Sequence, residues 1–364
     1  MLGDATDFVP IPGAAEEGPG RFRVRSSRVP SWSPKGIGLL FLGLAALPSL
    51  PIPGPPGDAT PARRVRGVRD GAILTFAFAP DGETIASIST GGRVALRHAA
   101  AGAGAHSFLE HSGPARALAF SPDGRSLAVG VLESDIFLYG IRDGGAGHPL
   151  GMPILAAASL ACSPDGRLLA ASSYLDADIL LWDLAAGRER ARLRGHGSPV
   201  VSMAFAHDGR SLASGGQRDG AIITWDLATG RALRRLGVPR EPVTLLAYAP
   251  DGRWLASAGA FGGHGRLWDL EGRHGDRPIE GLSSARNPLA FSPDGRLLAT
   301  ADADGVVRLR DPATGAERCR VGGPADPLRG VAFSPDGRVL AATGTDADIR
   351  LWDVAEVLES RLGQ

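Results

Sequence analysis

The sequence predicts an all-β protein built from seven four-stranded antiparallel sheets. The prediction rests on two segments that recur along the chain. One segment is "AFSPDGRLLAT" at residues 290–300, with near copies such as "AFSPDGRSLAV" from Ala119. The other is a Trp-Asp pair that follows an apolar run, as in "IITWDLATGR" from Ile222. The two segments recur in the same phase, so each repeat is one structural unit.

The first segment predicts two strands, a and b, that are joined by a tight turn. In each turn Pro presets the first dihedral angle, Asp can bond the backbone ahead of it, and Gly accepts the conformation that follows. Apolar runs flank the turn, for example residues 118–120 before it and residues 127–129 after it. The turn aspartate recurs every 42 or 43 residues, at Asp81, Asp123, Asp165, Asp208, Asp251, Asp294 and Asp336.

The Trp-Asp segment predicts a third strand, c, and the residues after it predict a fourth strand, d. The segment "ERARLRG" at residues 189–195 alternates polar and apolar residues, as a half-exposed edge strand does. The inner strands are apolar at nearly every residue, so neighbouring repeats must cover both faces of each small sheet. Radial stacking of this kind is a seven-bladed β-propeller, which we expect to span residues 61–358, with a C-terminal tail at 359–364.

The last repeat lacks a fourth strand of its own. It ends in "LWDVAEVLESRLGQ", without the Gly turn and the Arg-rich strand that follow Trp182. The segment "ARRVRG" at residues 62–67 precedes the first strand a and has no sheet of its own. We therefore expect residues 62–66 to supply strand d of the last blade, which closes the ring and removes exposed sheet edges.

These features resemble the WD-repeat β-propellers, through the period, the Trp-Asp pair that ends strand c, and the pair Gly195-His196. In that family a hydrogen-bonded tetrad joins a His before strand a, a Ser or Thr on strand b, an Asp in the b–c turn and the Trp of strand c. The resemblance places these groups at His111 and His196; Ser89 and Ser173; Asp176, Asp219, Asp304 and Asp346; and Trp182, Trp225, Trp268 and Trp352.

The first two repeats depart furthest from the family pattern. Other residues stand at the Trp position in three repeats and at the Asp position in three repeats, namely Arg97, Tyr139 and Arg310, and Gly91, Glu133 and Gly262. On this assignment no single repeat holds all four groups of the tetrad. We expect the first two blades to be less rigid, with the fold itself unchanged.

Charge and cysteine content argue against two classes of function. The chain carries 39 basic and 39 acidic residues with no basic stripe, so nothing indicates nucleic acid as a partner. Cys162 occupies a strand a position that Phe holds in other repeats, and Cys319 falls in another blade. We therefore expect a small buried side chain at Cys162 and no disulfide between the two.

Residues 1–60 are rich in Gly and Pro, contain no copy of the repeat, and lie outside the ring. Within them residues 36–52 carry no charge and follow a basic stretch that ends at Lys35. The apolar core, residues 37–47, is too short to span a membrane as a helix and matches the apolar region of a secretion signal. We expect a signal or a membrane anchor here, and hence an exported or membrane-anchored protein. A cytosolic linker is the alternative, because the basic stretch begins late and no Ala-x-Ala site follows.

The sequence contains no recognisable reaction centre. It has no Gly-x-Ser-x-Gly elbow, no phosphate-binding loop that ends in Lys-Ser/Thr, and no His-Glu-x-x-His. The Asp-Ala-Asp segments in the b–c turns supply two carboxylates each, whereas a calcium loop needs six or more oxygens. We therefore predict no enzyme, no cofactor and no metal site. The rival is a propeller hydrolase such as a lactonase, but the strand a ends that would line the channel read "TFAF", "ALAF" and "MAF".

The resemblance implies a non-catalytic scaffold for protein–protein interaction, and the loops indicate which face binds. The a–b and c–d turns lie on one face and repeat with little change, whereas the b–c and d–a loops lie on the other face and differ between blades. We expect a monomeric propeller that binds other proteins; an exported or membrane-anchored sensor that binds a ligand is the alternative. The candidate partner-binding residues on the variable face are Tyr174, Arg218, Arg240, Phe261 and His264.

Overall fold

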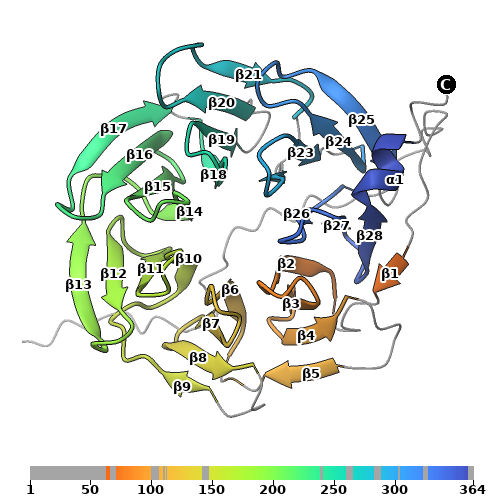
Figure 1. The fold of residues 1–364 in the computed structure, drawn as a ribbon. Helices are drawn as coiled ribbons and strands as arrows, with labels where there is room; N and C mark the ends of the chain where they lie inside the picture. The colour runs from red at the N-terminus through yellow and green to blue at the C-terminus, as the bar shows by residue number, and fades with distance from the viewer. Residues whose placement is uncertain are drawn as a thin grey trace, which may run out of the picture. The chain divides into compact units, whose positions relative to one another are not determined.

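The computed structural model describes residues 63–65, 71–99, 106–109, 111, 113–141, 147–237, 241–259, 265–282, 288–301, 304–322 and 327–359. These residues form a ring of seven four-stranded antiparallel sheets (Figure 1), so the predicted fold class is confirmed. The N-terminal segment 1–60, with its apolar stretch 36–52, and residues 360–364 of the tail lie outside the described residues. In the described part of the chain, no helix has the length and apolar character needed to cross a membrane.

The first four blades follow the chain in order, each with strands a to d from the channel outward. Blade 1 contains β2 (Ile73–Phe78), β3 (Thr84–Ser89), β4 (Val94–His98) and β5 (His106–Leu109). Blade 2 contains β6 (Ala115–Phe120), β7 (Ser126–Val131), β8 (Ile136–Gly140) and β9 (His148–Pro149). Blade 3 contains β10 (Ala157–Cys162), β11 (Leu168–Ser173), β12 (Ile179–Asp183) and β13 (Arg188–Leu193). Blade 4 contains β14 (Val200–Phe205), β15 (Ser211–Gly216), β16 (Ala221–Asp226) and β17 (Ala232–Gly237).

The last three blades include the one that joins the two ends of the ring. Blade 5 contains β18 (Val243–Tyr248), β19 (Trp254–Gly259), β20 (Gly265–Asp269) and β21 (Arg277–Ile279). Blade 6 contains β22 (Leu289–Phe291), β23 (Leu298–Ala301), β24 (Val306–Arg310) and β25 (Glu317–Gly322). Blade 7 contains β26 (Gly330–Phe333), β27 (Val339–Thr343), β28 (Ile349–Asp353) and, as its fourth strand, β1 (Arg63–Val65).

Strand β1 closes the ring, as the sequence predicts. It pairs antiparallel with β28, with Arg63 opposite Leu351 and Val65 opposite Ile349. Val65 is only 4% exposed and packs with Ile349 and Leu351. The chain then ends in α1 (Val354–Glu359), a helix that the sequence analysis did not predict; it buries Val354 and Val357 in the core cluster that includes Cys319 and Val321 of β25.

Each a–b turn is held by its own side chains. In blade 3 the Ser163 hydroxyl donates to Asp165 Oδ1 at 2.5 Å, and the same carboxylate oxygen accepts the backbone N–H of Arg167 at 3.0 Å. Ser163 Oγ also accepts the N–H of Leu168 at 2.9 Å. Gly166 has φ 69°, in the left-handed region that favours glycine. The local sequence alone therefore sets where strand a ends and strand b begins.

The core lies between blades rather than within them. Every residue of β11 is buried, whereas the first four residues of the outer strand β17 are exposed. One apolar cluster joins Leu181 and Leu193 of blade 3 to Ile223 and Trp225 of blade 4. Neighbouring blades therefore cover each other's faces, and each blade depends on the next for its stability.

Candidate interaction surfaces

Blade 4 holds a complete tetrad, which corrects the expectation that no blade does. Trp225 Nε1 donates to Ser214 Oγ at 2.7 Å, and Ser214 Oγ lies 2.7 Å from His196 Nε2. His196 Nδ1 lies 3.2 Å from Asp219 Oδ2. Burial lowers the pKa of His196, and the Asp219 carboxylate opposes that shift. A neutral imidazole that donates from Nδ1 to Asp219 and accepts the Ser214 proton at Nε2 satisfies all four groups.

The sequence assignment of the tetrad hydroxyl to Ser89 and Ser173 is wrong. In blade 4 Ser214 lies opposite the third residue from the end of strand a. The residues at the same position of strand b in blades 1, 3, 5 and 6 are Ser87, Ala171, Ser257 and Thr300. Ser173 instead donates to the Leu155 carbonyl at 2.6 Å, and Ser89 Oγ accepts the N–H of Arg93 at 3.2 Å. A serine eleven positions before the Trp of strand c, as in blades 4 and 5, is the signal that would have found it.

Among the described residues, the other blades show only parts of the tetrad. In blade 5 Trp268 Nε1 donates to Ser257 Oγ at 2.8 Å, whereas in blade 3 the buried Trp182 Nε1 has no partner among the described residues, because Ala171 replaces the serine. His111 Nδ1 lies 2.6 Å from the Gly113 carbonyl, so it contacts its own loop. Trp352 is 1% exposed.

The b–c turn aspartates have partners of different kinds. Asp346 Oδ1 accepts from Arg350 Nη1 at 3.0 Å, and Asp304 pairs in the same way with Arg308. Asp176 Oδ1 accepts the N–H of Asp178 at 3.2 Å. The b–c turn carboxylate is therefore bound by an arginine of strand c in blades 6 and 7. In blade 4 its partner is His196.

Two of the five predicted partner-binding residues lie within the described residues. Arg218 is exposed on the b–c turn of blade 4, where its backbone N–H donates to Ser198 Oγ at 3.0 Å. Tyr174 is half-buried on the b–c turn of blade 3, and its N–H donates to the Ala156 carbonyl at 3.1 Å. Arg240, Phe261 and His264 lie outside the described residues, so their role stays a prediction.

The variable face also carries two exposed leucines that the sequence analysis missed. Leu155 is 59% exposed and Leu175 is 74% exposed; the only other large apolar side chain exposed in the described residues is Leu233, at 58%. The Ser173 hydroxyl joins the two loops, since it donates to the Leu155 carbonyl and accepts the N–H of Leu175 at 3.0 Å. Leu155, Tyr174 and Leu175 together form the blade 3 patch. Only the structure shows that these residues from two loops lie together.

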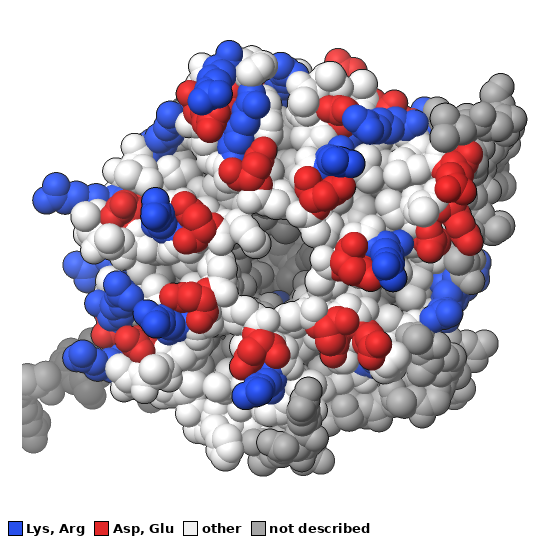
Figure 2. All heavy atoms as spheres, viewed as in Figure 1, with Lys and Arg blue, Asp and Glu red and all other residues white. Residues whose placement is uncertain are grey.

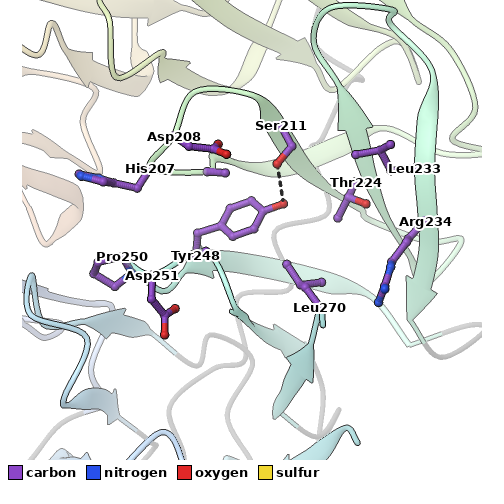
Figure 3. Close-up of a pocket in the computed structure, with 12 residues that line it drawn as sticks. His207, Asp208, Ser211, Thr224, Leu233, Arg234, Tyr248, Pro250, Asp251 and Leu270 are labelled. Atoms are coloured by element: carbon purple, nitrogen blue, oxygen red, sulfur yellow. Dashed lines mark hydrogen bonds between the residues drawn. The ribbon is translucent and has the colours of Figure 1, made fainter. Parts of the chain in front are cut away.

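The opposite face carries paired charges and a pocket. Acidic and basic side chains lie next to each other around a central hollow (Figure 2). A pocket of about 350 Å³ opens between blades 4 and 5, with Tyr248 at its centre (Figure 3). The Tyr248 hydroxyl lies 3.4 Å from Ser211 Oγ of the neighbouring blade.

Two features of the described residues bear on catalysis, namely the placement of possible metal ligands and the state of the cysteines. No three His, Cys, Asp or Glu side chains among them are placed to hold a metal ion. Both cysteines are free thiols. Burial, together with Asp165 and Asp123, raises the pKa of Cys162 to about 11, so this thiol is protonated and weakly nucleophilic at neutral pH.

Comparison with known proteins identifies the family. The family model described as "WD domain, G-beta repeat" matches residues 104–139, 147–183, 187–226, 230–269, 283–311 and 317–353. These segments cover more than half of the chain, so the protein belongs to the WD40 repeat family. Members of this family typically act as protein-interaction scaffolds and are generally not catalytic. No curated protein matches the chain.

The matched segments are offset from the blades. The segment 187–226, for example, runs from strand β13 of blade 3 through strand c of blade 4. Strands β2, β3 and β4 of blade 1 fall in no matched segment, although the structure gives them the same pairing as the others. Blade 1 is therefore the blade that departs furthest from the family model, although its Pro-Asp-Gly turn at Asp81 is a copy of the repeat.

Proposed function

We propose that this propeller is a non-catalytic scaffold that binds a partner protein on its variable face, through the blade 3 patch and Arg218. The observation that carries the proposal is the exposure of Leu155 and Leu175, two apolar side chains on loops of the same face whose backbones meet at the Ser173 hydroxyl. Burying a leucine side chain stabilises by roughly 1.5–3 kcal/mol, so covering both contributes substantially to binding.

The composition of this region fits a protein interface. The loop that carries Tyr174 and Leu175 also carries Asp178, which pairs with Arg194 at 3.1 Å, and Arg218 is exposed on the b–c turn of the next blade. Interfaces commonly combine an apolar centre with a polar rim, and Tyr and Arg are frequent hot spots. The rigid blades beneath hold the loops in place, so little order must be gained on binding.

The test compares two double variants of the full-length chain, purified by affinity tag from the cells that make it. Leu155→Ser with Leu175→Ser should reduce a specific co-purifying protein by at least about tenfold. The melting temperature should stay within a degree or so, because exposed loop substitutions usually change stability by less than ~0.5 kcal/mol.

The control variant is Arg125→Glu with Arg167→Glu, on the opposite face. Both side chains are well exposed, at 76% and 80%, and neither contacts the blade 3 patch. This variant should retain the partner. Loss of the partner from the control, with retention by the leucine variant, would overturn the choice of face.

We also propose that residues 36–52 carry the propeller to a membrane or out of the cytosol. The order of a basic stretch, an uncharged apolar stretch and a Pro-rich stretch supports this. Cell fractionation checks it: the chain should sediment with membranes or appear outside the cytosol, and a variant with Leu40→Asp and Leu42→Asp should not. A wild-type chain found wholly in the cytosolic fraction would leave the linker as the correct reading.

A further inference from the structure

The pocket between blades 4 and 5 lies at a break in a ring of turn-to-turn contacts. In six of the seven a–b turns the Gly packs beside the Pro of the preceding turn: a Cβ placed on Gly166 would lie 3.5 Å from Pro122 Cδ. The turns at Gly82, Gly124, Gly209, Gly295 and Gly337 make the same contact at 3.5–3.8 Å. A Cβ on Gly252 would meet nothing within 4 Å, so this is the one open junction of the seven, all of them in described residues.

A single residue accounts for the opening. Blade 4 has His207 where the six other turns have Pro, so the ring that would pack against Gly252 is missing. The imidazole of His207 points away from Tyr248 and leaves the space beside it open (Figure 3). The pocket's lining includes His207 and Asp208 from one turn and Pro250, Asp251 and Gly252 from the next.

Two carboxylates of the pocket lack the partners that compensate the same group in other blades. In four blades a serine hydroxyl donates to the turn aspartate at 2.5–2.6 Å, and the arginine after the glycine lies 3.9–4.0 Å from it. Blades 4 and 5 have Ala206 and Ala249 in place of the serine. Asp208 and Asp251 each accept one backbone N–H, at 2.9 Å, and no arginine in the described part of the chain lies within 4 Å of either.

Arg253, the arginine that follows the turn glycine in blade 5, contacts other groups than Asp251. Its guanidinium stacks over the Trp254 ring, 5.0 Å from the centroid, and its Nε lies 3.9 Å from Asp269 Oδ1. It therefore faces blade 5 and leaves Asp251 uncompensated. The pocket consequently has an acidic end at the two turns, on opposite sides of Tyr248 in Figure 3.

The rest of the pocket is mixed: hydroxyl groups of Ser211 and Thr224 line it beside aromatic and apolar side chains, and Arg234 lies at the end away from the two carboxylates. Tyr248 stands where five other blades have Phe, and its ring lies along the cavity (Figure 3). Leu233 and Leu270 line the far end, and Leu233 is 58% exposed. Leu233 belongs to β17, the outer strand of its sheet, whose free edge can pair with an extended peptide.

We propose that this pocket binds the basic side chain of an extended peptide segment in a partner protein, an arginine or a lysine next to an apolar residue. Asp208 and Asp251 pair with the cation, the Tyr248 ring supports it, and Leu233 with Leu270 contacts the apolar neighbour. The volume of about 350 Å³ is at the small end of the roughly 300–1,000 Å³ of ligand pockets, and suits one such side chain with its neighbour.

The test measures binding of the synthetic peptide acetyl-Gly-Leu-Arg-Gly-amide to the full-length chain by isothermal titration calorimetry. A peptide with citrulline in place of arginine keeps the shape and removes the charge; it should bind at least about tenfold more weakly. Free L-arginine amide tests the source of the cation, and should also bind at least about tenfold more weakly than the peptide. Raising the salt concentration should weaken binding of the arginine peptide, because salt screens the charge of carboxylates that are partly exposed.

Two variants of the pocket test the residues. Asp208→Asn with Asp251→Asn should weaken binding of the arginine peptide at least about tenfold and leave binding of the citrulline peptide unchanged. His207→Pro should restore the contact with Gly252, close the pocket and remove binding, while the melting temperature stays equal or rises, since six other turns carry this Pro. Asp123→Asn, in a turn that keeps its Ser121 partner, is the matched control and should bind as the unaltered chain does.

The outcomes separate this proposal from the variable-face proposal. Leu155→Ser with Leu175→Ser should leave peptide binding intact, so either proposal can fail alone. Equal binding of the citrulline peptide, or full binding by the Asp208→Asn and Asp251→Asn variant, would overturn the cation site. Equal binding of free arginine amide would show a small-molecule site in place of a peptide site.

Discussion

Blade 4 and blade 1 have the same backbone pairing but differ in the side chains between their strands. In blade 4 Leu212 lies opposite Trp225, and in blade 1 Ile85 lies opposite Arg97. The four polar groups of blade 4 are all hydrogen-bonded. In blade 1 the buried atoms Ser87 Oγ, Arg97 Nε and Arg97 Nη1 have no partner within the described residues.

The difference shows that a blade can fold without the tetrad. Blade 1 folds with the register of blade 4 because its turn, its apolar faces and its neighbours are the same kind. Burial lowers the pKa of Arg97, and Asp348 opposes that shift, as expected for a cation held in an apolar site. A buried polar group without a partner costs about 1–3 kcal/mol. Blade 1 therefore depends on packing against its neighbours in the ring for its stability.

The largest expected effect is the loss of Trp225. Trp225→Ala should lower the free energy of unfolding by about 3–5 kcal/mol, because it empties a large buried site and leaves Ser214 without its donor. Arg97→Leu, at the same place in blade 1, should be neutral or stabilising, because an apolar side chain replaces a buried cation whose Nε and Nη1 have no hydrogen-bond partner among the described residues. Denaturant unfolding measures both, and a similar cost for the two would show that the blades do not differ in this way.

Removing strand β1 should weaken the seam between blade 7 and blade 1. A chain that starts at Asp70 loses the pairing of Arg63, Arg64 and Val65 with β28 and exposes Ile349 and Leu351. It should melt several degrees lower than a chain that starts at Ala59, and should aggregate through the free edge. Equal melting temperatures in differential scanning calorimetry would mean that the closing strand adds no stability.

The hydroxyl at the tetrad position should matter in blade 4 and not in blade 1. Ser214→Ala leaves His196 Nε2 and Trp225 Nε1 without a partner and should cost about 1–3 kcal/mol. Ser87→Ala removes a hydroxyl whose oxygen has no described partner, and should change stability by less than ~0.5 kcal/mol. Thermal unfolding of the two variants gives the comparison; a greater loss for Ser87→Ala would contradict it.

The smallest expected effect is a pH dependence that the buried His196 gives to blade 4. The pKa of folded His196 is lowered by burial, so the unfolded chain takes up the proton first as pH falls below ~6.5. Stability is therefore complete above that pH and declines as pH falls toward the folded pKa. His196→Gln should flatten the slope of unfolding free energy between pH 7 and 5; an unchanged slope would exclude His196 as its source.

Asp219 contributes at more acidic pH with the same sign. Burial raises its pKa, but the N–H groups of Gly197 and Ala221 and the His196 side chain outweigh burial, so the net shift is downward. Its stabilisation is present above the unfolded value of ~3.9 and is lost as pH falls through the folded pKa. The two groups are thus distinguishable by the pH range in which each titrates.

The sequence by itself determined the number of blades, their order and the closing strand. The Pro-Asp-Gly turn is a local structure, held by bonds such as Ser163 to Asp165, so its recurrence counts the hairpins directly. The missing fourth strand of the last repeat and the surplus segment at residues 62–66 then left one way to complete the ring. Both inferences succeeded because they needed only contacts close in sequence and the rule that sheet edges are paired or covered.

Only the tertiary structure decided which side chains meet. The tetrad serine is Ser214 rather than a residue aligned with Ser89 or Ser173, because a shift of two residues keeps the same face of a strand and the pattern cannot distinguish them. Leu155 and Leu175 come together from two loops, and the effect of His207 is felt at Gly252, one blade away. Such contacts depend on strand register and on the packing of one blade against the next, which a single repeat does not encode.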